Sequence, residues 1–432
     1  MATRIILNYI ALYLFIFLYN YYCIRADHMK PRESPPSPHQ HIGSACDLIL
    51  DGYQRHQEVE NFLRRVCEMH ENVTELFDIG STYEGRRMLV LKIGFKKQAT
   101  TPANERRKSA WIDGGIHARE HIAPSTVLYI ICQVHIFIFF LKGITVNSKK
   151  ITNLLTQSDW YFLPVVNPDG YEYSFTKNRM WRKNRRPTSP NCIGVDLNRN
   201  WIFGWGGADS EANPCAFNYR GEHAESEAEV INIVRFITDQ QSCDSQFFSF
   251  ITYHSYGQKI YTGAQHGYGD NNEATALAYE MSKSIKKVNG AHYQVGTSSA
   301  LAYPFGGGSS DWAKRVVQIK YSYLIELRDR GQNGFLLTRK EIVPTGQEQW
   351  AAILKLGAAI LNAQNLKKVI NCTDETKLKY QYKHPKLEKL NIHIAQRHKN
   401  SWKSMISNIG STNVKHYLTV FILFFVIIVL LS

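Results

Sequence analysis

The stretch that decides the fold is residues 111–120, WIDGGIHARE, an apolar run that enters a glycine turn and delivers His117, Arg119 and Glu120 at its end. Three other stretches have the same design and end on polar residues: 247–255 with His254, 321–329 with Glu326, and 193–200 with Asp196, Asn198 and Arg199. In open α/β sheets, ligands bind outside the carboxyl ends of the strands, so these side chains are expected to meet in one crevice. The sequence therefore predicts an α/β fold with a single site.

The residues gathered at these strand ends suit a zinc ion. A catalytic zinc site typically has three protein ligands such as His₂Glu and leaves its fourth position to water. His117, Glu120 and His254 fill this description. An H-x-x-E pair is weak evidence by itself, because that spacing usually belongs to a solvated helix face. The histidine and the second glutamate at later strand ends make the metal site the better interpretation, and we expect one zinc ion per chain.

Six motifs occur in an order that resembles the zinc metallocarboxypeptidases, specifically the digestive carboxypeptidase A and B branch. They are HARE at 117–120, NPDGYEYS at 167–174, NRMWRKNR at 178–185, GVDLNRNW at 194–201, HSYGQ at 254–258 and ELRD at 326–329. The resemblance covers about residues 51 to 365. It implies one catalytic domain in which a mixed central β-sheet is flanked by helices on both faces. It also implies hydrolysis of the C-terminal peptide bond and a disulfide between Cys192 and Cys215.

Hydrolysis of an amide needs a nucleophile, a proton carrier and a partner for the charge that develops on the carbonyl oxygen. Zinc lowers the pKa of bound water toward about 7, which supplies the nucleophile. The resemblance assigns the general base, and later the acid, to Glu326, and the oxyanion partner to Arg182. Asp196 resembles the carboxylate that orients a metal-bound histidine, here His117. Without the motif, Glu326 would be interpreted as a surface residue paired with Arg328.

Cleavage at the chain end requires recognition of a free carboxylate. Asn198 and Arg199 offer an amide donor and a bidentate fork, and Tyr303 resembles the mobile tyrosine that closes over the bound end. Four more residues match family subsites: Arg119, Ser255, Tyr256 and Phe335. Ser310 stands where basic-specific members carry Asp and carboxypeptidase A has an apolar residue. Because serine cannot compensate the desolvation of Lys or Arg, we expect release of hydrophobic or aromatic residues, with basic residues as the alternative.

Composition divides the rest of the chain. Residues 1–26 read as a secretory signal peptide, with an uncleaved signal anchor as the alternative, and 27–43 form a Pro-rich linker. Residues 44–365 are the expected catalytic domain, followed by a basic stalk at 366–416. The tail at 417–432 carries a 15-residue apolar run, shorter than the roughly 20 residues of a spanning helix. Small residues upstream favour a GPI attachment signal, with a short tail anchor as the second interpretation.

Charge and cysteine usage indicate the environment. Of the net charge of +14, the stalk contributes +8, because it holds eleven Lys or Arg against three Asp or Glu. We interpret it as solvated, with attraction to an anionic membrane surface as the alternative, and expect no nucleic-acid binding. Eight cysteines and two glycosylation acceptors, Asn72 and Asn371, fit the secretory route. The chain is expected outside the cell, tethered to the surface, acting as a monomer on peptide and protein C-termini.

Hydrophobic periodicity predicts helices over residues 57–70, 222–239, 273–289 and 344–362, and a hairpin over 77–94. A helix over 121–131 is followed by 132–149, which is more apolar than the resemblance would imply, and is expected either to be buried or to expose apolar surface. Digestive members carry a folded inhibitory prosegment, for which no room remains here. The chain is therefore expected either to be synthesised in an active form or to lack the prosegment as an aid to its folding.

Two other functions are compatible with the sequence. One is a catalytically inactive homologue that binds peptides, and the other is a zinc deacylase that acts on small acylated amino acids. The presence of every expected ligand and catalytic residue argues against the first. The long segment around Tyr303 fits the second less well than it fits a carboxypeptidase.

Overall fold

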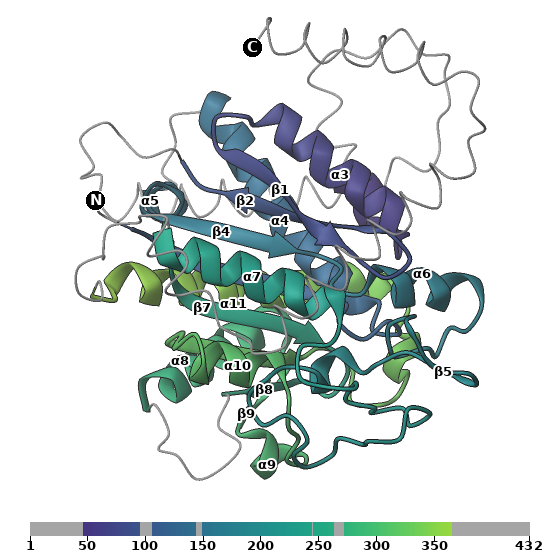
Figure 1. Cartoon of the computed structure of the whole chain (residues 1–432). Coiled ribbons are helices and arrows are strands. Elements are labelled where there is room, and N and C mark those ends of the chain that lie inside the picture. The colour runs from purple at the N-terminus through teal and green to yellow at the C-terminus, as the bar shows by residue number, and fades with distance from the viewer. Residues whose placement is uncertain (1–45, 96–105, 144–148, 244, 263–271, 365–432) are drawn as a thin grey trace, which may run out of the picture. The chain divides into compact units, whose positions relative to one another are not determined.

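A mixed eight-stranded sheet forms the centre of the protein (Figure 1). The computed structural model describes residues 46–95, 106–143, 149–243, 245–262 and 272–364. The strands, in sheet order, are β1 Thr74–Ser81, β2 Arg87–Ile93, β4 Ser158–Leu163, β3 Arg107–Gly114, β7 Ser245–His254, β10 Tyr321–Glu326, β8 Lys259–Tyr261 and β9 Gln294–Gly296. A separate pair consists of β5 Pro187–Ser189 and β6 Cys192–Ile193. The predicted α/β class with a mixed central sheet is confirmed.

Strands β4, β3, β7 and β10 run parallel to one another and form the middle of the sheet. All ten residues of β7 are buried, as expected for a strand that is covered on both faces. In register, Gly114 pairs with Tyr253, and Glu326 pairs with His254. The ends of three strands therefore meet at one edge of the sheet, where the sequence predicted the site.

Alternate residues along the strands build two cores, one on each face of the sheet. On one face, Leu91, Ile112 and Phe162 belong to a core shared with α3 His56–Met69, α4 Ile122–Gly143, α8 Asn272–Asn289 and α11 Ile342–Asn362. On the other face, Val90, Trp111 and Tyr161 pack with α7 Ala228–Cys243 and α10 Ser309–Arg315. The structure also contains three short helices: α5 Lys149–Gln157, α6 Pro168–Thr176 and α9 Ser298–Leu301. Helices thus flank both faces, as expected.

Three predicted elements differ from the structure. Helix α7 begins at Ala228 instead of residue 222. The backbone amide of Glu225 donates to the carbonyl of Asn200 at 2.6 Å, and that of Glu227 donates to Asn200 Oδ1 at 3.1 Å. These bonds hold the segment before Ala228 outside the helix. Within the stretch 193–200, only Ile193 belongs to a strand, which is β6. The stretch turns at Gly194, where φ is +91°, and continues into the 3₁₀ turn η2, Leu197–Arg199. The helix predicted over 121–131 is longer and continues to Gly143 as α4, whereas the other predicted helices and the hairpin occur with small shifts of their ends.

The segment predicted to depart from the family pattern begins inside α4, which runs without a break to Gly143. Cys132 is buried and forms a disulfide with Cys46, with 5.8 Å between the two Cα atoms. One turn later, His135 is buried, and its Nδ1 lies 2.7 Å from Nε2 of His70. The start of the segment is therefore part of the core. Residues 144–148 lie outside the described ranges.

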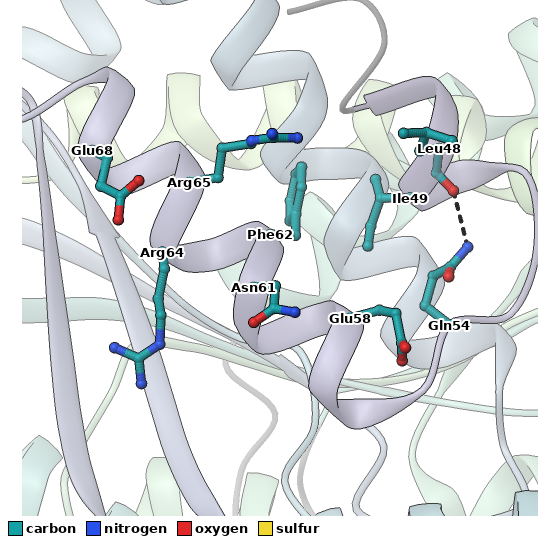
Figure 2. Close-up of a pocket in the computed structure, with 9 residues that line it drawn as sticks. All are labelled: Leu48, Ile49, Gln54, Glu58, Asn61, Phe62, Arg64, Arg65 and Glu68. Carbon is teal, nitrogen blue, oxygen red and sulfur yellow. Dashed lines mark hydrogen bonds between the residues drawn. The ribbon is translucent and has the colours of Figure 1, made fainter. Parts of the chain in front are cut away.

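A groove of about 640 Å³ lies along α3 (Figure 2). It is lined by Leu48, Ile49, Gln54, Glu58, Asn61, Phe62, Arg64, Arg65 and Glu68. None of these is a candidate site residue. The predicted signal peptide, linker, stalk and tail lie outside the described residues, and so does Asn371. Within the described ranges, no helix has the length and apolar character needed to cross a membrane.

Replacing Cys46 and Cys132 together by alanine should lower the free energy of unfolding by about 2–5 kcal/mol, because the disulfide closes a long loop of the unfolded chain. Urea denaturation followed by circular dichroism measures the change. Cys67→Ser is the matched control, since Cys67 is a free cysteine that packs partly buried beside the same core. Equal midpoints for the double variant and the unchanged protein would contradict the expectation.

Candidate active site

His117, Glu120 and His254 come together where the parallel strands end. His117 Nδ1 lies 2.8 Å from Glu120 Oε1 and 3.2 Å from His254 Nδ1, and His254 Nδ1 lies 3.1 Å from Glu120 Oε2. All three side chains are buried. Across the described ranges, no other group of three or more His, Cys, Asp or Glu side chains has ligand atoms close enough to hold one metal ion.

The turn after β3 places two of these ligands. Gly115 has φ of +68°, a conformation that L side chains rarely adopt, and a Cβ there would come within 2.9 Å of Pro124. The amide of Glu120 then bonds to the carbonyl of His117 at 3.2 Å. This turn brings residues three apart in sequence onto the same side, so both side chains face His254.

The donor set fits a cation. Asp196 Oδ1 lies 3.2 Å from His117 Nε2. Although burial favours the neutral acid, Arg182 and Arg199 hold the pKa of Asp196 well below its usual range. An ionised carboxylate only accepts hydrogen bonds, so Nε2 of His117 carries the proton and its Nδ1 presents a lone pair. Burial and Arg182 also lower the pKa of His117, which favours this neutral form.

This lone pair of His117 faces a carboxylate oxygen of Glu120. Burial acts to raise the pKa of Glu120, but His117 and His254 lower it overall, so the carboxylate is ionised. Two acceptors 2.8 Å apart repel unless a cation lies between them. Two imidazoles and one carboxylate are ligands that zinc prefers, and the Asp196–His117 contact is typical of zinc sites.

Glu326 ends β10 beside His254. Its Oε2 is buried and forms no hydrogen bond with the part of the chain that the structure describes. Burial raises the pKa of Glu326 to about 7. The charge of Glu120 adds to the rise, whereas His254 and Arg182 oppose it. A carboxyl group with this pKa can exchange a proton near neutral pH, as a general base requires.

Arg182 is held as a fixed positive charge. Its Nε donates to Asp196 Oδ2 at 3.0 Å, and its Nη2 lies 2.9 Å from the same oxygen. The carbonyl of Arg182 accepts from the amide of Ala118 at 3.0 Å, which ties its loop to the turn that carries the metal ligands. Asp196 therefore orients both His117 and Arg182.

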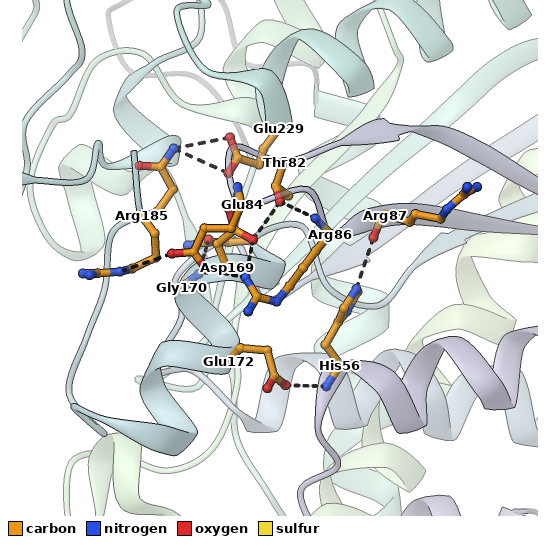
Figure 3. Close-up of polar contacts among 12 residues, drawn as sticks. His56, Thr82, Glu84, Arg86, Arg87, Asp169, Gly170, Glu172, Arg185 and Glu229 are labelled. Carbon is orange, nitrogen blue, oxygen red and sulfur yellow. Dashed lines mark hydrogen bonds and ion pairs between the residues drawn. The ribbon is translucent and has the colours of Figure 1, made fainter. Parts of the chain in front are cut away.

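The loop that carries Arg182 is fixed from behind by polar contacts, and Figure 3 shows those around Asp169, Thr82 and Arg86 nearby. Asn184 Nδ2 donates to Glu227 at 2.7 Å and to Glu229 at 3.3 Å, while its Oδ1 accepts from the amide of Val195 at 2.7 Å. Nearby, Asp169 accepts from Thr82 at 2.7 Å and from Arg86 at 2.8 Å. The first set of contacts joins the Arg182 loop to the start of α7, and the second joins the hairpin β1–β2 to the start of α6.

Asn198 and Arg199 lie in η2, and both are buried. Asn198 Oδ1 accepts from the amide of Ser309 at 3.0 Å, which leaves its amino group as the donor. Arg199 Nε donates to the Asp209 carbonyl at 2.7 Å, Nη1 donates to the Asn198 carbonyl at 3.0 Å, and Nη2 pairs with the Asp209 carboxylate. Arginine has five N–H donors, so these contacts leave one donor on each Nη atom.

The other predicted subsite residues fall into two groups. Arg119, Tyr256 and Phe335 lie together: the guanidinium stands 4.0 Å over the phenylalanine ring, and the tyrosine ring meets it edge-on at 4.9 Å. Ser255 is buried beside them and donates its amide to Glu120 Oε2 at 3.2 Å. Tyr303 is 54% exposed and near enough to influence the pKa of Arg182. Ser310 is buried in α10, and the disulfide Cys192–Cys215 is present.

Two residues that sequence reasoning missed contact the predicted set. Asp209 pairs with Arg199 from an irregular loop, where no periodic pattern marks it. Phe305 lies with its ring 4.6 Å from the Arg199 guanidinium. The only available signal was its place two residues after Tyr303, which does not indicate where the ring points.

Comparison with known proteins places this geometry in a family. Residues 59–352 match the model of peptidase M14, described as zinc carboxypeptidase. The chain belongs to this family. Among similar proteins, carboxypeptidase B of Astacus astacus is 37% identical over 306 residues, covering 70% of this chain and 94% of its own. Carboxypeptidase A2 of Mus musculus is 38% identical over 304 residues, covering 69% and 67%.

Other relatives carry a different name. The inactive metallocarboxypeptidase ecm14 of Talaromyces stipitatus is 35% identical over 339 residues, which cover 73% of this chain. The match spans only 56% of that protein's length. Among solved structures, thrombin-activatable fibrinolysis inhibitor superposes with a TM-score of 0.65 at 32% identity, covering 76% of this chain and 81% of its own. Carboxypeptidase A of Helicoverpa armigera gives 0.63 at 27%, covering 82% and 81%.

Asp196→Asn should weaken zinc binding about 10- to 100-fold, because the amide can donate to His117 Nε2 and so favours the wrong tautomer. Competition with a chromogenic chelator measures the affinity without relying on activity. Asp78→Asn, at an exposed position on β1, should leave the affinity unchanged. Equal affinities for Asp196→Asn and the unchanged chain would rule out this role for Asp196.

Glu229→Gln should flatten the dependence of stability on pH. Burial and the neighbouring Glu227 raise the pKa of Glu229 from 4.5 to about 8, so the folded chain holds a proton that the unfolded chain has released. The contribution of this group is full below about pH 4.5 and is lost as pH rises to about 8, with a slope of at most about 1.4 kcal/mol per pH unit.

Urea denaturation at pH 5, 6.5 and 8 tests this expectation. The free energy of unfolding of Glu229→Gln, relative to the unchanged chain, should rise steadily across the series. Glu211→Gln, at an exposed position, serves as the control and should run parallel to the unchanged chain. A parallel course for Glu229→Gln as well would show that Glu229 is ionised in the folded state.

Proposed function

We propose that the chain is a zinc-dependent carboxypeptidase that hydrolyses the C-terminal peptide bond of peptides and proteins and releases a hydrophobic residue. The observation that carries this proposal is the convergence of the ligand atoms of His117, Glu120 and His254 beside Glu326 and Arg182. Membership of the zinc carboxypeptidase family supports the same conclusion.

The residues around the metal centre have separate tasks in this mechanism. Zinc, when bound, supplies the Lewis acidity that makes water a sufficient nucleophile near neutral pH. Glu326 takes the proton from the attacking water and later returns it to the leaving amine, for which its raised pKa is suited. Arg182, held by Asp196, presents its charge to the developing oxyanion, an interaction typically worth about 3 kcal/mol.

Restriction to the chain end follows from the carboxylate-binding residues. The two remaining donors of Arg199 and the amino group of Asn198 suit a terminal carboxylate, which prefers a bidentate partner. Tyr303 is exposed and free to close over the bound residue, while Arg119, Tyr256 and Phe335 would contact residues further from the chain end. A longer chain without a free carboxylate at this point would leave the two remaining donors of the buried Arg199 without an acceptor.

The pocket floor supports a preference for an uncharged side chain. Ser310 is buried at the start of α10 and offers a hydroxyl group instead of a charge. Burying Lys or Arg without a carboxylate partner is costly, so hydrophobic or aromatic residues are the proposed products. Basic C-terminal residues are the alternative specificity.

A second candidate function is that of an inactive peptide-binding homologue. The observation in its favour is the likeness of 35–36% to several proteins named inactive metallocarboxypeptidase, of which the chain spans a little over half the length. Against it stand Glu326, which pairs in register with His254, and Arg182, which is bonded to Asp196.

We also propose a place outside the cell. The disulfides Cys46–Cys132 and Cys192–Cys215 support an oxidising compartment. Asn72 of the acceptor Asn72-Val73-Thr74 is exposed in the turn between α3 and β1, where glycosylation would meet no obstacle. Tethering through the C-terminal tail belongs to the same proposal.

Assays of the purified chain on blocked dipeptides ending in Phe, Val, Lys or Glu, with and without a chelator, test the function. Glu326→Gln should lower kcat about 100- to 10,000-fold while zinc content stays at one per chain. Glu341→Gln is the control for loss of a carboxylate near the site. Retained cleavage by Glu326→Gln would refute the mechanism, and a zinc-loaded chain that cleaves none of these peptides would favour the inactive homologue.

A further inference from the structure

The residues expected to line the pocket for the C-terminal side chain lie along one face of β10. Ser322, Leu324 and Glu326 lie on that face, and successive members of this series are about 6.6–6.8 Å apart along the strand. Ser322 Oγ donates to the carbonyl of Ser310 at 2.7 Å, which places the pocket floor over Ser322. Glu326 marks the opposite, catalytic end. Leu324 therefore lies below the path between the scissile bond and the floor.

Phe305 occupies this middle position. Its ring belongs to a small core of its own with Tyr261 and Leu324, and Leu301 packs against this core. The side chain is 8% exposed and lies 4.6 Å from the guanidinium of Arg199. It therefore stands between the residue that binds the substrate's carboxylate and the floor at Ser310.

The backbone around Phe305 prevents the ring from moving back. Gly307 has φ of +72°, and a Cβ there would lie 2.3 Å from the Arg199 carbonyl, so this segment is pressed against η2. A Cβ on Gly308 would lie 2.5 Å from Cε2 of Phe305, so the ring rests directly on that glycine. The ring is held by its own segment on one side and by Leu324 on the other.

We propose that Phe305 shortens the pocket, so that the chain releases small aliphatic residues, of the size of alanine to valine, in preference to phenylalanine, tyrosine or tryptophan. This inference rests on the proposed carboxypeptidase function and narrows its substrate class. A side chain whose carboxylate is bound by Arg199 must pass Phe305 to reach Ser310. An aromatic ring would have to displace the buried phenylalanine, whereas a valine side chain stops before it.

The test compares kcat/KM for blocked dipeptides ending in Ala, Val, Leu and Phe, using zinc-loaded protein. The unchanged chain should prefer Val to Phe at least about tenfold, since pocket shape of this kind is worth about 10- to 200-fold. Phe305→Ala should raise the ratio of kcat/KM for the Phe substrate to kcat/KM for the Ala substrate by about tenfold or more. Phe305→Leu should be intermediate.

Two controls separate pocket size from general damage. Phe77→Ala removes a partly buried phenylalanine from β1, at the edge of the sheet, and should leave the Val-to-Phe ratio unchanged even if it lowers stability. Melting temperature and zinc content are measured for every variant. An unchanged ratio in Phe305→Ala, or a preference of the unchanged chain for Phe, would overturn the proposal.

A binding measurement decides the inference even if no peptide is cleaved. Calorimetry with N-acetyl-valine and N-acetyl-phenylalanine should show tighter binding of the valine derivative to the unchanged chain and a reversal in Phe305→Ala. Absence of cleavage together with this reversal would refute the proposed enzymatic function and retain the pocket assignment. Equal affinities of both derivatives for both chains would refute the pocket assignment alone.

Discussion

The buried carboxylate of Asp196 connects the parts of the site to one another. One of its oxygens accepts from His117 Nε2 at 3.2 Å and from the amide of Asn198 at 3.0 Å, and the other binds Arg182. A candidate metal ligand (His117), the turn proposed to bind the substrate's carboxylate and the proposed partner of the oxyanion (Arg182) are thereby fixed relative to one side chain. Such an arrangement is stable only if every buried charge has a partner, and Asp196 supplies one for Arg182.

The parallel strands β4, β3, β7 and β10 explain why so many charged groups meet at one edge of the sheet. The register that pairs His254 with Glu326 brings a candidate metal ligand and the proposed general base to adjacent strand ends. Burial raises the pKa of Glu326 to about 7, with His254 and Arg182 opposing the rise and Glu120 adding to it. Electrostatic balance at this edge is thus a consequence of strand order and register.

Family membership and catalytic function are separate conclusions here. The chain matches proteins named carboxypeptidase A2 and carboxypeptidase B as well as proteins named inactive. The fold is common to these relatives, so the fold cannot decide between the two functions. The site favours an enzyme, because it combines a buried donor set that suits zinc, a glutamate with a raised pKa and an arginine held by a carboxylate.

The sequence alone determined the fold class and predicted that His117, Glu120 and His254 come together as a candidate metal site, because strand ends and ordered motifs are local signals. The resemblance carried by those motifs implied the pairing of Cys192 with Cys215, which the structure contains. The turn at Gly115 and the H-x-x-E spacing already require His117 and Glu120 to lie on one side. The wrong start predicted for α7 shows the limit of such signals, since the amides of Glu225 and Glu227 are captured by a distant asparagine.

Only the tertiary structure decided which groups without a local pattern enter the site. Asp209 pairs with Arg199 through an irregular loop, and Phe305 reaches the pocket because its glycine-rich segment is pressed against η2. The Cys46–Cys132 disulfide likewise joins residues 86 apart, and it showed that the apolar segment after residue 131 begins as a core helix. Side-chain contacts between distant segments depend on how helices and loops pack across the sheet, and no periodicity or spacing in the sequence encodes that packing.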